Sequence, residues 1–253
     1  MPTPPAATQP NELHGQVALI TGSTSGIGLE AARLFVREGA SVILSGRNAE
    51  RGAEALTTLP DGPGTARFVA ADLGDLDSVS ALAEQAGPVG ILVNNASVFP
   101  AAPTTEQSIA VFQQMFDINV RGTYFLTASL VPAMLERGRG SIVNVSSGSA
   151  SKGVPGVSAY SATKAALESF TRTWAAEFSP HGVRVNSVAP GPTMTEGALA
   201  EMGDAAAELA DSLPLRRTGR PSEIAEAILF LASPRAGFIT GANLAADGGI
   251  TAV

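Results

Sequence analysis

The sequence predicts a doubly wound parallel α/β fold, in which helices cover both faces of one sheet. Short apolar runs rich in β-branched residues recur along the chain, longer segments with helical spacing separate them, and no break in composition divides them. The predicted strands are residues 17–21, 41–45, 66–70, 89–94, 141–146 and 184–189. Because parallel strands need crossover connections, we expect right-handed helical crossovers and one domain over residues 15–253.

Apolar residues at helical spacing support the segments between these strands. Three such sets are Ile27, Ala31, Leu34 and Phe35; Val79, Leu82 and Ala83; and Phe112, Met115, Phe116 and Phe125. A further helix is predicted over residues 158–174. Residues 193–213 follow a strand and lie between prolines, so they are interpreted as a mobile substrate lid, with an ordinary connecting helix as the alternative.

The composition excludes several classes of protein. The 253 residues carry a net charge of −7, which disfavours binding to nucleic acid or an anionic membrane surface. There is no cysteine, which removes thiolate sites and fits a reducing compartment, so a cytoplasmic protein is expected. Only His14 and His181 are available, and no metal site is predicted. Residues 1–14 lack a basic start and an apolar run, so we expect a disordered tail rather than a targeting signal.

A glycine-rich turn follows the first predicted strand and opens a helix. Residues 21–28 have the spacing G-x-x-x-G-x-G, in which glycines allow a tight turn and free N–H groups at the helix start attract a pyrophosphate. A purely structural turn is the alternative. The candidate cofactor-binding residues here are Gly22, Ser23, Thr24, Ser25, Gly26, Ile27 and Gly28.

The end of the second strand bears on the choice of cofactor. No carboxylate stands there to accept hydrogen bonds from a ribose hydroxyl, whereas Arg47 suits a 2′-phosphate. The residues therefore favour NADP(H) over NAD(H), with a solvated surface arginine as the alternative. Asp72, after the third strand, is a candidate for the adenine amino group or a simple helix N-cap.

Tyr160 and Lys164 lie one turn apart on the predicted helix 158–174. A phenol has a pKa of about 10, and a nearby ammonium lowers it toward the range in which proton transfer is efficient. Ser147 ends a strand at the same sheet edge, where its hydroxyl could polarise a substrate oxygen; no histidine is placed to make it a nucleophile. A surface Tyr/Lys contact and a loop-capping serine are the alternatives.

Together these residues resemble the short-chain dehydrogenase/reductase family, in its single-domain branch with a Rossmann-like fold. The resemblance runs from Gly15 to Gly249. Its motifs are residues 21–28, the segment Asn94-Asn95-Ala96-Ser97 with Ser97 in place of the usual glycine, Asn119, the Ser147, Tyr160 and Lys164 set, Pro190-Gly191, and Asp247-Gly248-Gly249.

The resemblance implies a role for each catalytic candidate. Tyr160 would give or take the hydroxyl proton, Lys164 would lower the Tyr160 pKa and hold the nicotinamide ribose, and Ser147 would orient the substrate oxygen. Asn119 would hold a water linking Lys164 to solvent. Further cofactor contacts are expected from Tyr160 and Lys164 themselves and from Leu73, Asn95, Ala96, Pro190, Gly191, Thr193 and Thr195. The family also implies a homo-oligomer, either a tetramer or a dimer.

The function expected from the sequence is NADP(H)-dependent interconversion of a carbonyl and a secondary alcohol. The substrate would be a ketone, a β-ketoacyl group or a similar small molecule, because the expected lining is largely apolar: Val98, Phe99, Val154, Pro155, Met194 and Met202. The alternatives are the same chemistry with NAD(H), a non-catalytic dinucleotide-binding regulator, and an epimerase or dehydratase of the family's extended branch, which carries a longer chain.

Overall fold

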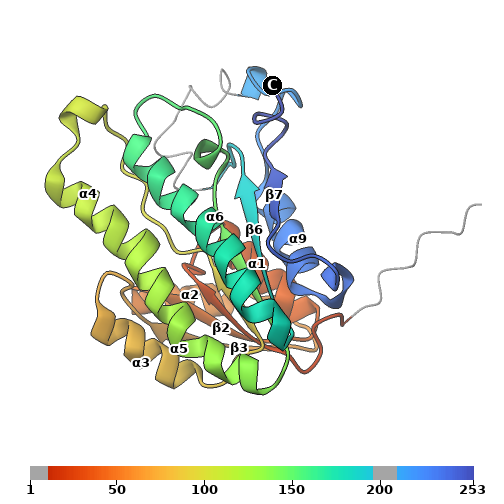
Figure 1. Ribbon diagram of the computed structural model, residues 1–253. Coiled ribbons are helices and arrows are strands. Elements are labelled where there is room, and N and C mark those ends of the chain that lie inside the picture. The colour runs from red at the N-terminus through yellow and green to blue at the C-terminus, as the bar shows by residue number, and fades with distance from the viewer. Residues whose placement is uncertain (1–10, 196–209) are drawn as a thin grey trace, which may run out of the picture.

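Seven parallel strands form one sheet in the computed structural model, which describes residues 11–195 and 210–253 (Figure 1). Their order across the sheet is β3-β2-β1-β4-β5-β6-β7. The chain therefore starts near the middle, runs to one edge, and returns to build the other, as the predicted doubly wound fold requires. The strands are β1 (Val17–Thr21), β2 (Ser41–Gly46), β3 (Thr65–Ala70), β4 (Ile91–Asn94), β5 (Gly140–Val145), β6 (Val183–Pro190) and β7 (Asn243–Ala246).

Helices cover both faces of this sheet, which confirms the predicted fold class (Figure 1). One core joins the sheet to α1 (Gly26–Arg37), α2 (Ala49–Thr57) and α9 (Pro221–Ala232). The other joins it to α3 (Leu76–Ala86), α5 (Thr123–Glu136) and α6 (Ser158–Phe178). Alternate residues of a strand point to opposite faces, so in β1 Ala18 and Ile20 enter the first core and Leu19 the second.

One long helical run crosses the second face with an interruption. It consists of α4 (Ile109–Phe116), a π-helical turn at Asp117–Gly122, and α5. A π turn inserts one residue into the helical repeat and is often found at functional sites. Here it turns Asn119 into the protein interior, where its side chain is fully buried.

The structure corrects several predicted bounds. The strand predicted at 89–94 begins at Ile91, although the Gly90 N–H already donates to the Val17 carbonyl of the neighbouring β1. The helix predicted at 158–174 continues to Phe178. Strand β7 was not predicted, since it is four residues long, largely exposed and poor in β-branched side chains.

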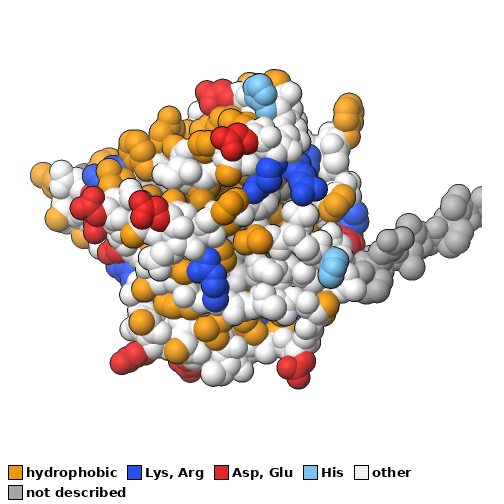
Figure 2. All heavy atoms as spheres, turned by 90° about the horizontal axis from the view of Figure 1, so that it is seen from below, with side chains coloured by type: hydrophobic (Ala, Val, Ile, Leu, Met, Phe, Trp, Pro, Cys, Tyr) orange, Lys and Arg blue, Asp and Glu red, His pale blue; other side chains and the backbone are white. Residues whose placement is uncertain are grey.

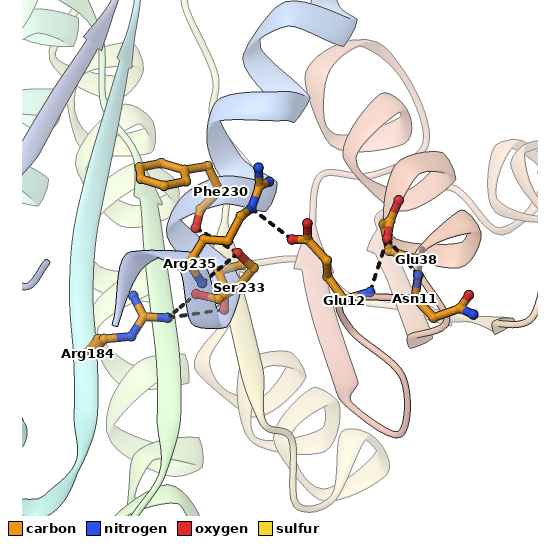
Figure 3. A network of polar contacts seen from close by, with 8 residues as sticks. Asn11, Glu12, Glu38, Arg184, Phe230, Ser233 and Arg235 are labelled. Carbon is orange, nitrogen blue, oxygen red and sulfur yellow. Dashed lines mark hydrogen bonds and ion pairs between the residues drawn. The ribbon is translucent and has the colours of Figure 1, made fainter. Parts of the chain in front are cut away.

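The N-terminal segment also differs from the expectation of a disordered tail that runs to residue 14. Leu13 is 1% exposed, and the Glu38 carboxylate accepts hydrogen bonds from the N–H groups of Asn11 and Glu12, both at 3.1 Å. Glu12 in turn pairs with Arg235 at 2.9 Å (Figure 3). Residues 11–14 therefore belong to the folded domain, because burial of Leu13 and these bonds fix them.

At the amino ends of the strands, basic side chains lie on the surface of the protein (Figure 2). Figure 2 shows this edge from below, with basic side chains in separate small groups among uncharged ones. A cavity of about 310 Å³ there is lined by Arg137, Arg139 and Arg184. Arg184 donates to the Leu231, Ala232 and Ser233 carbonyls at the end of α9, so it caps that helix. Figure 3 shows Arg184 beside Ser233.

Candidate functional site

The glycine turn between β1 and α1 is so tightly packed that two of its glycines leave no room for a side chain. Gly22 and Gly26 have φ of +63° and +55°, a region that side chains rarely adopt. A Cβ on Gly22 would lie 2.7 Å from the Ala96 Cα, and one on Gly28 would lie 2.5 Å from the Asn95 amide nitrogen. Glycine is thus required at both positions, and the turn keeps its backbone bare, as close approach of a diphosphate demands.

Replacing Gly28 with alanine tests this packing. The added Cβ would also lie 2.5 Å from the Gly22 carbonyl oxygen, so the turn must shift. We expect the variant to lose about 1–3 kcal/mol of unfolding free energy and to bind a dinucleotide more weakly. Thermal unfolding and fluorescence titration measure the two effects. Gly153→Ala is the matched control, because nothing lies within 4 Å of its added Cβ; equal behaviour of both variants would contradict the assignment.

Asn95 and Ala96 act on the turn from the end of β4. The Asn95 side-chain amide donates to the Thr21 and Gly22 carbonyls, both at 2.9 Å. The Thr21 hydroxyl accepts from the N–H groups of Asn95 and Ala96, both at 3.1 Å. Asn95 therefore holds the turn in shape with its side chain.

Ser23 serves the fold in the same region. It is fully buried; its hydroxyl donates to the Ile20 carbonyl at 2.7 Å and accepts from the Ser45 N–H at 3.0 Å. Its own N–H donates to the Ser45 carbonyl at 3.1 Å. Of the candidates in this turn, Ser23 thus has its polar groups engaged within the protein.

The start of α1 offers donors to an anion. Ser25 is the N-cap residue and makes no side-chain capping bond, so the first-turn N–H groups at Gly26, Ile27 and Gly28 are not capped by it. A cavity of about 260 Å³ opens beside Thr24, Ser25 and Gly26. Arg51 also lines this cavity; its position in the sequence does not predict this, because only the fold brings α2 beside the turn.

The remaining dinucleotide candidates lie at the carboxyl ends of neighbouring strands. Arg47 directly follows β2 and is exposed, without an ion pair among the described residues. Asp72 follows β3, where its carboxylate accepts from the Gly74 N–H at 2.9 Å. Leu73 is buried beside Gly122 of the π turn. Arg47 and Asp72 are thus both placed at the edge where the predicted ligand would lie.

Ser147 and Tyr160 meet at this same edge. Ser147 lies two residues beyond β5, and its hydroxyl accepts from the Ser149 N–H at 3.2 Å. Tyr160 lies in the first turn of α6. Burial raises the pKa of the Tyr160 phenol to about 12, although hydrogen bonds with the Ser147 and Ser97 hydroxyls act to lower it. The phenol therefore carries its proton at neutral pH in the cofactor-free protein.

Lys164 lies beside Tyr160, as the one-turn spacing predicts. Its Nζ lies 5.5 Å from the centroid of the Tyr160 ring and donates to the Val145 carbonyl at 2.8 Å. The side chain is 2% exposed, and this burial lowers the pKa of the ammonium to about 7. The expected lowering of the phenol pKa by Lys164 stays a prediction; in the structure, burial of the phenol outweighs its hydrogen bonds with the Ser147 and Ser97 hydroxyls.

Asn119 has its side-chain amide engaged. The amide donates to the Val98 carbonyl at 3.0 Å and to the Thr163 hydroxyl at 3.1 Å, and it accepts from the Val98 N–H at 2.9 Å. It thereby links the segment after β4 to α6, one residue before Lys164. Its expected role in holding a water stays a prediction, and the contacts here make it a positioning residue.

The segment after β6 completes the edge. Gly191 follows the end of the strand, and the Thr193 hydroxyl donates to the Gly191 carbonyl at 2.9 Å. Thr195 approaches the glycine turn, where a Cβ on Gly26 would lie 3.1 Å from its methyl group. Pro190 is the last residue of β6. Most of the predicted lid, residues 196–209, lies outside the described residues, as does Met202.

Several supporting contacts were missed by the sequence analysis. The Ser97 contact with Tyr160 was not expected, and Ser97 needs no positive φ, so its departure from the family motif causes no strain. The Phe99 ring packs edge-on against the Tyr160 ring, with centroids 4.5 Å apart. The buried Glu168 carboxylate accepts from the Ser146 hydroxyl at 2.8 Å. Only strand register and helix packing bring such partners together.

The described residues limit the other chemistry available. They hold no group of three or more His, Asp or Glu side chains placed to bind a metal ion. Within the same ranges no helix is long and apolar enough to cross a membrane. The site thus offers a proton-carrying phenol, a buried amine and hydroxyl donors beside a bare, donor-rich backbone turn.

Comparisons with known proteins agree with this arrangement. The family model described as enoyl-(acyl carrier protein) reductase matches residues 22–251. The chain is 41% identical to galactitol 2-dehydrogenase of Cereibacter sphaeroides, over 94% of this chain and 96% of that one. It is 37% identical to a 3-oxoacyl-(acyl-carrier-protein) reductase of Thermotoga maritima, over 94% and 98% of the two chains.

Solved structures of related dehydrogenases have the same fold as this chain. One described as a short chain dehydrogenase/reductase family protein is 60% identical, covers 96% of this chain and 100% of its own, and superposes with a TM-score of 0.91. Another, a gluconate 5-dehydrogenase from Beutenbergia cavernae described as putative and NAD(P)-dependent, has bound NADP; it is 36% identical with a TM-score of 0.92, and the match covers 97% of this chain and 100% of that one. The chain belongs to the short-chain dehydrogenase/reductase family.

Proposed function

We propose that the protein is an NADP(H)-dependent oxidoreductase that interconverts a carbonyl group and a secondary alcohol. One observation carries the proposal: the Tyr160 phenol lies against the Ser147 hydroxyl with the Lys164 amine 5.5 Å from its ring centre. The glycine turn at the same sheet edge, in which a Cβ at Gly22 or Gly28 would clash, fits a bound dinucleotide.

Each residue has a distinct part in this mechanism. The bound nicotinamide supplies the hydride chemistry. Tyr160 donates its proton to the substrate oxygen during carbonyl reduction and takes it back during alcohol oxidation. Ser147 holds that oxygen by a hydrogen bond, which strengthens as negative charge develops on it. Lys164 lies where a positive charge would stabilise the phenolate needed in the oxidative direction.

The preference for NADP(H) is the more specific part of the proposal. Arg47 is free of ion pairs among the described residues and directly follows β2, where its guanidinium can contact a 2′-phosphate. No carboxylate precedes it to accept bonds from a ribose hydroxyl. The two solved relatives named for gluconate 5-dehydrogenase and 2-deoxy-D-gluconate 3-dehydrogenase activity have bound NADP, which supports the same choice.

Reversing the charge at Arg47 tests this preference. A charged hydrogen bond contributes about 1.5–3 kcal/mol, so Arg47→Glu is expected to weaken NADP(H) binding roughly 10- to 150-fold. NAD(H) affinity should stay the same or rise, since a carboxylate can accept from the ribose hydroxyl. Calorimetric titration with both cofactors measures the ratio. Arg139→Glu makes the same charge change at the opposite sheet edge and controls for long-range electrostatics; an equal loss for both cofactors would exclude a 2′-phosphate contact.

The substrate class is proposed from the side chains around Tyr160. Phe99 packs edge-on against the reactive ring, and Val154, on the loop between Ser147 and Tyr160, exposes its apolar side chain. Relatives are named for alcohol substrates such as cyclopentanol and cis-4-hydroxycyclohexanecarboxylate. We therefore expect cyclic or branched secondary alcohols and their ketones, with β-ketoacyl compounds as a further group.

A panel assay tests the function as a whole. Absorbance of the reduced cofactor is followed with NADP(H) and NAD(H) side by side across ketones, β-ketoacyl thioesters and secondary alcohols. Turnover with at least one class supports the proposal. Tight dinucleotide binding without turnover on any of them would favour the regulatory alternative.

Self-association is part of the proposal. Large apolar side chains are exposed along α4 and α5, including Ile109, Phe112, Tyr124 and Phe125. Single exposed apolar residues are normal on a protein surface, but several large ones on two consecutive helices suit a homo-oligomeric interface. The cytoplasmic location expected from the sequence stays a prediction.

A further inference from the structure

The residues after β7 form a closely bonded turn at the carboxyl edge of the sheet (Figure 1). The Asp247 carboxylate accepts from the Gly249 N–H at 2.8 Å and from the Thr251 N–H at 3.1 Å, and it also accepts from the Thr251 hydroxyl. Gly248 and Gly249 adopt φ of +65° and +87° to complete the bend. We refer to residues 247–253 as the C-terminal turn.

The C-terminal turn packs beside the segment after β6, where the nicotinamide is proposed to lie. A Cβ on Gly191 would lie 2.5 Å from the Asp247 carbonyl oxygen, and the Gly191 N–H donates to the Ala246 carbonyl at 3.1 Å. The turn also contacts the chain that follows the undescribed segment, because the Leu215 N–H donates to the Gly248 carbonyl at 3.2 Å. The C-terminal turn thus contacts both the segment after β6 and the segment around Leu215.

The loop between Ser147 and Tyr160 contacts the same turn. A Cβ on Gly148, the residue after Ser147, would lie 3.5 Å from the side chains of Ile250 and Thr251. This loop carries Val154, one of the proposed substrate contacts. The loop that carries Val154 and the C-terminal turn are therefore in close contact at Gly148.

Lys152 bonds the loop to the turn directly. Its Nζ donates to the Ile250 carbonyl at 2.8 Å and to the main-chain oxygen of Val253 at 3.4 Å, across about one hundred residues of sequence. The backbone of Lys152 is fixed as well, since its N–H donates to the Gly148 carbonyl at 3.1 Å and ends the short helical turn that begins after Ser147. It is one of only two lysines in the chain.

We propose that Lys152 is a positioning residue of the substrate site, whose ammonium ties the loop between Ser147 and Tyr160 to the C-terminal turn. This inference rests on the proposed function. Ser147 and Tyr160 are themselves placed by β5 and α6, whereas the loop between them is bonded to other segments through Lys152 and through the Gly156 carbonyl, which accepts from the Ala102 N–H at 2.8 Å. Loss of the ammonium should therefore affect substrate binding far more than the proton transfer.

The experiment compares Lys152→Met, Lys152→Arg and the charge-matched control Arg139→Met in the full-length protein. For Lys152→Met we expect KM for the carbonyl or alcohol substrate to rise about ten-fold with kcat changed by less than about three-fold. Cofactor Kd should stay constant. Hydrogen exchange should become faster in residues 148–157 and 247–253. Lys152→Arg retains a cationic donor and should restore KM and protection, and Arg139→Met should match the unaltered protein.

The outcomes separate this inference from the function it rests on. Exchange needs no turnover, so it decides the tether even if no substrate is found and the proposed function fails. Unchanged exchange in Lys152→Met overturns the tether. A fall in kcat with KM unchanged also overturns it, because the lysine would then act on the reacting groups. If Lys152→Arg does not restore protection from exchange, a cationic hydrogen-bond donor at position 152 is not what holds the loop.

Discussion

Tyr160→Phe is expected to reduce kcat by about 10²- to 10⁴-fold, the range typical for removal of a general acid or base. The phenol carries its proton at neutral pH, because burial raises the pKa of Tyr160 to about 12. Phenylalanine keeps the ring that packs against Phe99 but removes the hydroxyl that faces Ser147. Binding of the dinucleotide depends mainly on the glycine turn and should change little.

Steady-state kinetics with fluorescence titration of the cofactor measure both quantities. Tyr124→Phe is the matched control, since Tyr124 is the second tyrosine of the chain and lies half-exposed on α5 among aromatic rings. Its kcat should stay near that of the unaltered protein. Turnover by Tyr160→Phe at the normal rate would move the proton transfer to another group and leave Tyr160 only a binding role.

The fold was largely predictable because buried parallel strands are written as continuous apolar runs. Residues 17–21 and 41–45 contain little else, and both form strands in the structure. Strand β7 escaped prediction because its four residues are mostly exposed and its alanines carry no strand preference. The burial of Leu13 could not be predicted either, because it depends on packing against residues that are distant in the sequence.

The candidate site was predictable where chemistry follows local spacing. Tyr160 and Lys164 are four residues apart on a helix, so their proximity follows from helix geometry alone. The direction of the Tyr160 pKa could not be predicted, because it depends on burial that only tertiary packing creates. The contact of Lys152 with Ile250 likewise depends on where the chain ends up in space. Sequence thus identifies the reacting groups, and packing decides their electrostatics and supports.

Lys164 should make the cofactor-free protein measurably less stable at low pH than at high pH. Burial lowers the pKa of its ammonium from 10.5 in the unfolded chain to about 7 in the folded one. Between these values the unfolded chain binds a proton that the folded chain does not, so the contribution of Lys164 to stability rises with pH across this window. Below pH 7 the full penalty of burying the charge applies, roughly 5 kcal/mol relative to pH above 10.5.

Lys164→Met isolates this effect. The variant loses the hydrogen bond to the Val145 carbonyl at every pH, which is a roughly constant cost, but it removes the titrating group. The unfolding free energy of the variant minus that of the unaltered protein is therefore expected to be several kcal/mol more favourable at pH 6 than at pH 10. Urea unfolding at both pH values, without cofactor, measures the difference.

Arg139→Met provides the reference for this measurement. Its guanidinium is exposed, and arginine side chains are not deprotonated in proteins, so its difference from the unaltered protein should not vary with pH. If the difference in unfolding free energy for Lys164→Met also did not vary with pH, the folded protein would have to stabilise the ammonium through contacts other than the Val145 carbonyl. If the Lys164→Met difference varies with pH in the expected direction, the buried ammonium destabilises the folded protein when no cofactor is bound. A ligand group that solvates this charge would then stabilise the folded protein when it binds.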